Sequence, residues 1–136
     1  MKILTTVSTV VFLMILTTGL ATAKKVPVPT FPFTATGVIP YVIDTGFVLG
    51  PYSTDITVNE ASNGLFFGTI NWGGNPIVFS AAKDSSGVYN LNGLLGGTFT
   101  VTGTFTITYV KHKGFQVPIQ WGFPGYGESV AGTLSQ

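Results

Sequence analysis

The chain of 136 residues contains no cysteine and no arginine, and it has one histidine. Without cysteine the fold cannot contain a disulfide, and a lone histidine does not make a zinc site of the usual kind. Charged residues make up 8% of the chain, against about a quarter in an ordinary soluble domain. Six lysines and five acidic residues give a formal charge of +1, which supplies no basic patch for a phosphate backbone. Nucleic acid is therefore not expected as a partner.

The sequence also lacks the motifs that carry common enzyme chemistry. It has no G-x-S-x-G nucleophile motif, and the glycine-rich segment 93–97 lacks the lysine of a phosphate-binding loop. The acidic residues are scattered and show no calcium-loop spacing. His112 stands between Lys111 and Lys113 and predicts a charged hairpin tip. We expect no metal, no cofactor and no enzymatic activity, with a small secreted enzyme as the least favoured alternative.

The N-terminal segment has the features of a secretory signal peptide. Lys2 precedes an apolar run at 10–16, and Ala21-Thr22-Ala23 forms an A-x-A cleavage site. The run is shorter than the roughly 20 residues that span a bilayer. We therefore expect residues 1–23 to be removed and the product to be secreted, whether extracellular, on a cell surface or periplasmic. We expect no transmembrane segment after cleavage.

The remaining chain predicts an extended arm followed by one all-β domain. Residues 24–32 carry three prolines, which favour an extended arm or linker. From residue 33 to 136, no apolar residues recur at helical spacing, while glycine, threonine and β-branched residues are frequent. The turn signals predict a single-domain antiparallel meander of about eight short strands, at 35–43, 54–60, 65–72, 77–82, 87–91, 98–110, 115–121 and 129–134. These signals are Leu49-Gly50-Pro51, Asn63-Gly64, Gly73-Gly74-Asn75-Pro76, Asp84-Ser85-Ser86-Gly87, Asn92-Gly93 and Lys111-His112-Lys113-Gly114.

Alternation of side chains identifies the inner faces of two of these strands. Phe66, Gly68, Ile70 and Trp72 share one face of 65–72, and Phe115, Val117, Ile119 and Trp121 share one face of 115–121. Pro118 falls on the outer face of the second strand, and proline cannot donate to a sheet ladder. That position favours an edge strand, so the sequence favours an open sandwich over an up-and-down barrel.

A row of threonines is the most regular pattern in the chain. Between 98 and 109, threonine alternates with apolar residues, so that an unbroken strand would have one pure threonine face. Gly103 interrupts the apolar face and predicts a bulge, a bend or a split there. The row is either a solvated sheet face or a flat contact surface, and over these twelve residues it resembles the T-x-T arrays of ice-binding proteins, without their repetition over several rungs. Its members are Thr98, Thr100, Thr102, Thr104, Thr106 and Thr108.

Two segments combine aromatic residues, glycine and polar side chains. Such a mixture suits a glycan or small ligand, which stacks on an aromatic ring and hydrogen-bonds to amide or carboxyl groups. The competing interpretation places both tryptophans in the core beside glycine-rich turns. The candidate ligand-binding residues are Trp72, Asn75, Trp121, Phe123, Tyr126 and Glu128.

Two functional hypotheses follow for a secreted, non-catalytic protein that acts through its surface. The first is extracellular self-assembly or contact with a matrix or envelope, in which the partner is a second copy or another extracellular protein. It depends on the sparse charge, the threonine row and the proline-rich arm. The second is a monomeric glycan-binding or small-ligand-binding module, which depends on the aromatic segments.

Overall fold

The computed structural model of the protein describes residues 25–43 and 46–136. All regular secondary structure in these residues is β-strand, as the sequence predicts. The predicted signal peptide, residues 1–23, lies outside the described residues. In the part of the chain that is described, no helix has the length and apolar character needed to cross a membrane. The strands are β1 (Phe33–Val42), β2 (Val48–Ser62), β3 (Leu65–Trp72), β4 (Asn75–Lys83), β5 (Tyr89–Leu95), β6 (Phe99–Phe105), β7 (Thr108–Val110), β8 (Gly114–Gly122) and β9 (Ser129–Ser135).

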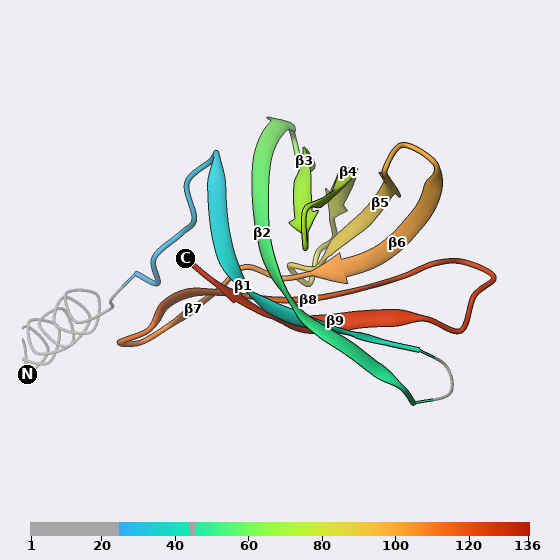
Figure 1. Ribbon diagram of the computed structural model, residues 1–136. Coiled ribbons are helices and arrows are strands. Elements are labelled where there is room, and N and C mark those ends of the chain that lie inside the picture. Colours follow the sequence, from blue (N-terminus) through green and yellow to red (C-terminus); the bar gives the residue numbers. More distant parts are fainter. Residues whose placement is uncertain (1–24, 44–45) are drawn as a thin grey trace, which may run out of the picture.

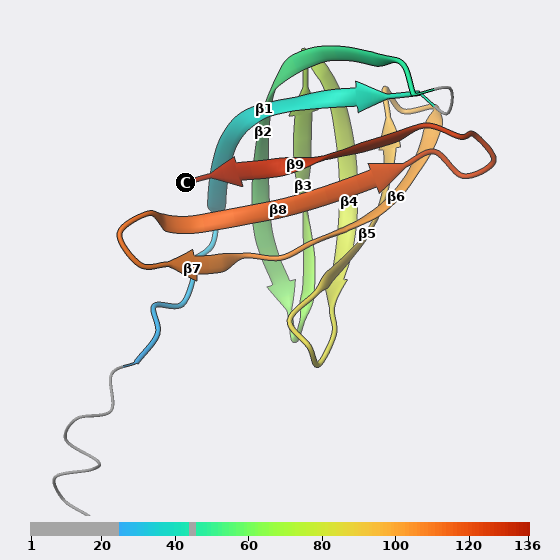
Figure 2. The same ribbon diagram turned by 90° about the horizontal axis from the view of Figure 1, so that it is seen from below.

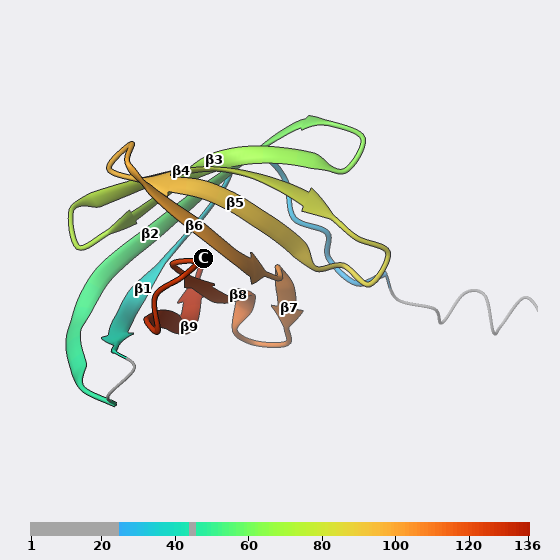
Figure 3. The ribbon, with the colours of Figure 1, turned by 90° about the vertical axis from the view of Figure 1, so that its right-hand side faces the viewer.

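The strands form a closed antiparallel barrel. β1 to β6 pair in chain order, and β9 and β8 continue the sheet on the other side of β1. β6 then pairs with β8, which closes eight strands into a ring and leaves β7 as an additional strand on β8. In Figures 1 and 2, β8 and β9 cross beneath β3, β4 and β5, while the long strands β1 and β2 bend from one layer to the other. Figure 3 shows the two layers and the bent strands β1 and β2 from the side.

The barrel corrects the sequence-based preference for an open sandwich. Pro118 lies in the middle of β8, which has β9 on one side and β6 and β7 on the other. The Pro118 carbonyl accepts a hydrogen bond of 3.1 Å from the Thr106 backbone N–H. Because both polar groups of one residue point to the same side in an antiparallel ladder, the missing donor faces the interruption between β6 and β7. Proline is therefore tolerated here without an edge strand.

The predicted strand 98–110 is two strands, and the break is not at Gly103. β6 ends at Phe105 and β7 begins at Thr108, so the interruption lies at 106–107, opposite Pro118. Gly103 is a regular member of β6 and pairs with Trp121 of β8. A Cβ atom at position 103 would lie 2.1 Å from the Gln120 carbonyl oxygen, so glycine is what allows β6 and β8 to approach.

Most predicted turns are confirmed, and two are wrong. Asn63 and Gly64 form the β2–β3 turn with positive φ, as this pair does in tight hairpins. Asn92-Gly93, in contrast, lies inside β5, where a Cβ on Gly93 would lie 2.7 Å from the Val78 carbonyl oxygen. Leu49-Gly50-Pro51 lies inside β2, which begins earlier than predicted. In both cases the glycine lies within a strand and not in a turn between strands.

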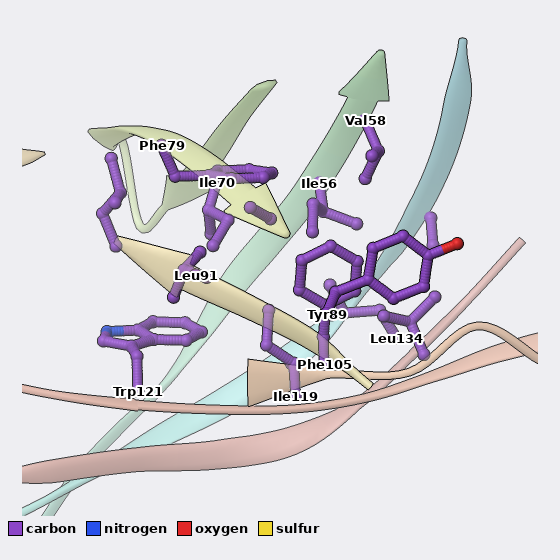
Figure 4. Close-up of a cluster of buried hydrophobic side chains, with 14 of the residues drawn as sticks. Ile56, Val58, Ile70, Phe79, Tyr89, Leu91, Phe105, Ile119, Trp121 and Leu134 are labelled. Carbon is purple, nitrogen blue, oxygen red and sulfur yellow. The ribbon is translucent and has the colours of Figure 1, made fainter. Parts of the chain in front are cut away.

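The barrel interior is a packed aromatic and aliphatic core (Figure 4). The inner faces predicted for 65–72 and 115–121 are confirmed, except that Phe115 is only partly buried. Tyr89 stacks on Phe105 with ring centroids 4.6 Å apart, and Phe66 packs edge-on against Tyr89 at 4.9 Å. Large aromatic pairs of this kind fill the space that closing eight strands creates.

The proline-rich arm carries no strand or helix over residues 25–32, and β1 begins at Phe33. Phe31 nevertheless packs against the core, with its ring centroid 5.1 Å from that of Phe66. The last residues of the arm therefore contact one end of the barrel. The opposite end of the barrel is built differently and contains the candidate site.

Candidate functional site

One end of the barrel is a shallow aromatic hollow, which we call the mouth. It has a volume of about 220 Å³. One side of its rim is the end of the β5–β6 hairpin, where Leu95, the last residue of β5, pairs with Phe99, the first residue of β6. The loop between β8 and β9 closes the other side. The mouth is defined by its lining residues, Tyr41, Leu95, Phe99, Phe123, Tyr126 and Glu128.

Strand register brings Tyr41 and Glu128, two of the polar residues of the mouth, close together. Tyr41 of β1 pairs with Val130 of β9, two residues after Glu128. Burial raises the pKa of the Tyr41 hydroxyl, and a hydrogen bond to Glu128 and the negative charge of its carboxylate raise it further. The Glu128 carboxylate has several lone pairs and can accept further hydrogen bonds from a ligand.

Two tryptophans lie in the core beneath the Tyr41 side of the mouth, and we call this pair the floor. Trp72 packs edge-on against Tyr41 at 5.3 Å and against Tyr52 at 5.4 Å. Trp121 meets Trp72 across the barrel interior at 5.8 Å with an interplanar angle of 87°. The Tyr41 ring is thus packed on Trp72 of β3, while Phe99 and Tyr126 on the rim are 55% and 63% exposed.

Both indole N–H groups of the floor are buried and have no hydrogen-bond partner among the described residues. Trp72 is 8% exposed and Trp121 is 2% exposed. Figure 4 shows the Trp121 nitrogen on the side of its ring away from Ile119 and Phe105.

Comparison of the chain with models of protein families, with curated proteins and with solved structures gives no match.

The structure brings together three of the six candidate ligand-binding residues. Phe123, Tyr126 and Glu128 all line the mouth. Trp72 and Trp121 are buried directly below, which agrees with their interpretation as core residues. Asn75 is exposed at the start of β4, where it pairs with Trp72, and it does not line the mouth.

The mouth also contains three residues that the sequence did not single out. Phe99 belongs to the apolar face of the threonine-rich strand, but β6 begins at this residue, so its ring lies on the rim rather than in the core. Leu95 falls outside the predicted strands and is the end of β5. Tyr41 carries no local signal, because its relation to Glu128 depends on the pairing of β1 with β9.

The threonine row lies on the outside of the barrel and is interrupted. Thr100 and Thr102 are exposed, and Thr104 is half-buried and accepts a hydrogen bond of 3.3 Å from Gln120 Nε2. Thr98 precedes β6, Thr106 lies in the break, and Thr108 belongs to β7. The row therefore does not form one continuous flat face. A shallow groove of about 470 Å³ runs beside it over β8 and β9.

The described lysines lie away from the mouth. Lys83 is at the far end of β4, and Lys111 and Lys113 flank His112 in the β7–β8 turn, as predicted. Lys25 lies in the arm, whose last residues contact the end of the barrel opposite the mouth. Within residues 25–43 and 46–136, no three histidine, cysteine or acidic residues gather as a metal site. Glu128 is thus the charged side chain among the residues that line the mouth.

Proposed function

We propose that the protein is a secreted, non-catalytic module that binds a small ligand at the mouth of its barrel. The observation that carries this proposal is the convergence of four aromatic rings and one tyrosine–carboxylate pair around a hollow of about 220 Å³. Ligand sites are concave, mostly apolar and equipped with a few placed polar groups, and the open ends of β-barrels are common positions for them. Secretion is proposed from the signal-like N-terminal sequence alone.

A ligand screen by nuclear magnetic resonance tests this function. The two indole N–H resonances and those of the β8–β9 loop should shift with any ligand that enters the mouth, because both tryptophans lie beneath it. The screen includes mono- and oligosaccharides and small organic molecules. Ligands that shift only the resonances of the outer wall would contradict the proposal.

A matched pair of variants separates the mouth from general surface stickiness. Phe99 lies in the mouth and is 55% exposed, while Phe67 lies on the outer wall of β3 and is 50% exposed. Phe99→Ala should abolish ligand binding, and Phe67→Ala should leave it unchanged. If both variants bind as the parent does, the mouth is not the site.

Self-assembly is a second candidate, and the uncharged outer wall of β6, β8 and β9 favours it. The outward side chains of these strands are threonine, glutamine, serine, alanine and proline. An uncharged wall lacks the repulsion that keeps copies apart. Barrel closure works against this candidate, since it removes free strand edges over most of the sheet. Light scattering of the secreted chain measures the oligomeric state, with a monomer supporting the first candidate.

A further inference from the structure

We propose that the ligand of the mouth is an organic cation that carries an alkylated ammonium group. This inference rests on the proposed function, since it assumes that the mouth binds a small ligand. The aromatic rings of the mouth would surround the alkyl groups of the cation, and Glu128 would face its positive charge. The proposal therefore names a chemical class, which is alkylammonium.

The lining of the mouth is mostly aromatic. Four of its six residues are Tyr41, Phe99, Phe123 and Tyr126, and a fifth is Leu95. Aromatic faces carry negative electrostatic potential, and several rings around one cavity are the usual means of binding quaternary ammonium groups. A neutral sugar would need several hydrogen-bonding side chains, whereas this lining offers the Tyr41 hydroxyl, the Tyr126 hydroxyl and the Glu128 carboxylate.

The local charge of the mouth is negative. Glu128 is half-buried among aromatic rings, and none of the described lysines, at positions 25, 83, 111 and 113, is among the lining residues. The mouth therefore carries a negative charge that these lysines do not neutralise. Tyr41 donates to the Glu128 carboxylate but brings no positive charge. A cation is the ligand that complements such a site.

Part of the mouth is preorganised, and its size is limited. Trp72 packs against the Tyr41 ring and is itself packed against Tyr52, so this part of the cavity wall is in place before a ligand arrives. A volume of about 220 Å³ is smaller than the range of about 300–1,000 Å³ for drug-sized ligands. It suits a compact head such as trimethylammonium. An unalkylated ammonium is strongly hydrated and is the poorer match for apolar walls.

Choline and its neutral isostere 3,3-dimethylbutan-1-ol test the role of charge. Both have the same shape, and only choline carries the positive charge. Titration of the full secreted chain at low ionic strength, followed by tryptophan fluorescence, should show choline binding at least about tenfold tighter than the isostere. Absence of choline binding overturns the cation proposal.

Two variants test whether the Glu128 carboxylate accounts for the affinity for choline. Glu128→Gln should weaken choline binding about tenfold or more and leave the weak binding of the isostere unchanged. Glu60→Gln, at the far end of β2, is the matched control and should bind choline like the parent. Equal choline affinity in the parent and in Glu128→Gln overturns the role given to the carboxylate.

The outcomes separate the two proposals. Equal affinity for choline and the isostere, both sensitive to Phe99→Ala, overturns the cation and keeps the mouth as a ligand site. Failure of both, with another ligand found at the mouth in the screen, does the same. Failure of both with no ligand at the mouth overturns both proposals.

A second arm distinguishes a free cation from a lipid head group. Vesicles of phosphatidylcholine carry the same trimethylammonium group at a bilayer surface. Co-sedimentation that free choline competes away would identify the head group as the source. Choline binding without co-sedimentation would identify a free cation, and either result supports an alkylammonium ligand.

Discussion

The backbone of Gly103 in β6 lies so close to that of Gln120 in β8 that no side chain fits between them. A Cβ at position 103 would be 2.1 Å from the Gln120 carbonyl oxygen and 2.7 Å from Trp121 Cα. Both neighbours are backbone atoms, which cannot rotate away. This contact is part of the pairing that joins β6 to β8 and closes the ring.

Gly103→Ala should destabilise the barrel by about 1–3 kcal/mol or more, as overpacking of a close contact does. Gly122→Ala is the control. A Cβ at position 122 would lie 3.3 Å from the carbonyl oxygen of Glu128, which belongs to the β8–β9 loop, so the contact is longer and its neighbour is a loop residue. Urea unfolding followed by circular dichroism measures both. Equal stability of the Gly103→Ala variant and the parent would mean that β6 and β8 are not held together at this point.

Trp121→Ala should cost about 3–5 kcal/mol, since it empties a large buried volume beneath the mouth. Tyr126→Ala removes a ring that is 63% exposed and should change the free energy of unfolding by about 0.5 kcal/mol or less. Trp121→Phe should cost less than the alanine variant, because it keeps a ring and removes the unpaired indole N–H. Denaturant unfolding gives the order of the three, and a small loss for Trp121→Ala would place that ring in the site instead of the core.

Stability should fall as the pH rises above about 10. Burial raises the pKa of Tyr89 above its ordinary value of 10.0, and the charge of Glu60 raises it further. Between the unfolded and the folded pKa, the unfolded chain has lost this proton and the folded chain retains it. Unfolding is therefore favoured by at most about 1.4 kcal/mol per pH unit for this group.

The Tyr89→Phe variant isolates this contribution. It should show a flatter loss of melting temperature between pH 9 and pH 11 than the parent, because the titrating hydroxyl is gone. Tyr126→Phe removes an exposed hydroxyl and serves as the control. A parent curve and a Tyr89→Phe curve of the same slope would contradict the burial of an ionisable group at this position.

Lysine at Thr102 and Thr104 should leave the protein folded and monomeric. Thr102 is exposed on the outer wall, and lysine there extends into solvent with a change of about 0.5 kcal/mol or less. Thr104 loses one hydrogen bond to Gln120. If the wall is instead a contact between copies, light scattering will show a parent oligomer that the double variant breaks, because the contact would bury unpaired charge.

Local patterns in the sequence correctly predicted those features of the fold that are set by residues close together in the chain. Alternation in 65–72 and 115–121 gave the inner faces, and Asn63-Gly64 marked a hairpin correctly. Closure of the barrel could not be predicted in this way, because it depends on the close approach of Gly103 to the carbonyl oxygen of Gln120, 17 residues later in the chain. Pro118 favoured the wrong alternative, since its missing donor faces a break in the opposite strand that no local pattern marks.

The residues of the candidate site also fall into two groups, those that the sequence could predict and those that it could not. Phe123, Tyr126 and Glu128 lie in one loop, so one segment of sequence contained all three. Tyr41 and Phe99 reach the same hollow from β1 and β6. Their proximity depends on the register of β1 with β9 and of β5 with β6, which is a property of the whole barrel.

The edge-to-face pair of Trp72 and Trp121 also has an optical consequence. Two indoles 5.8 Å apart at 87° couple their electronic transitions, so their circular dichroism differs from the sum of two isolated chromophores. Trp72 comes from β3 and Trp121 from β8, and the two strands face each other only across the closed interior. The coupled signal is therefore an intrinsic spectroscopic reporter of barrel closure, one that disappears when the ring opens even if the individual strands persist.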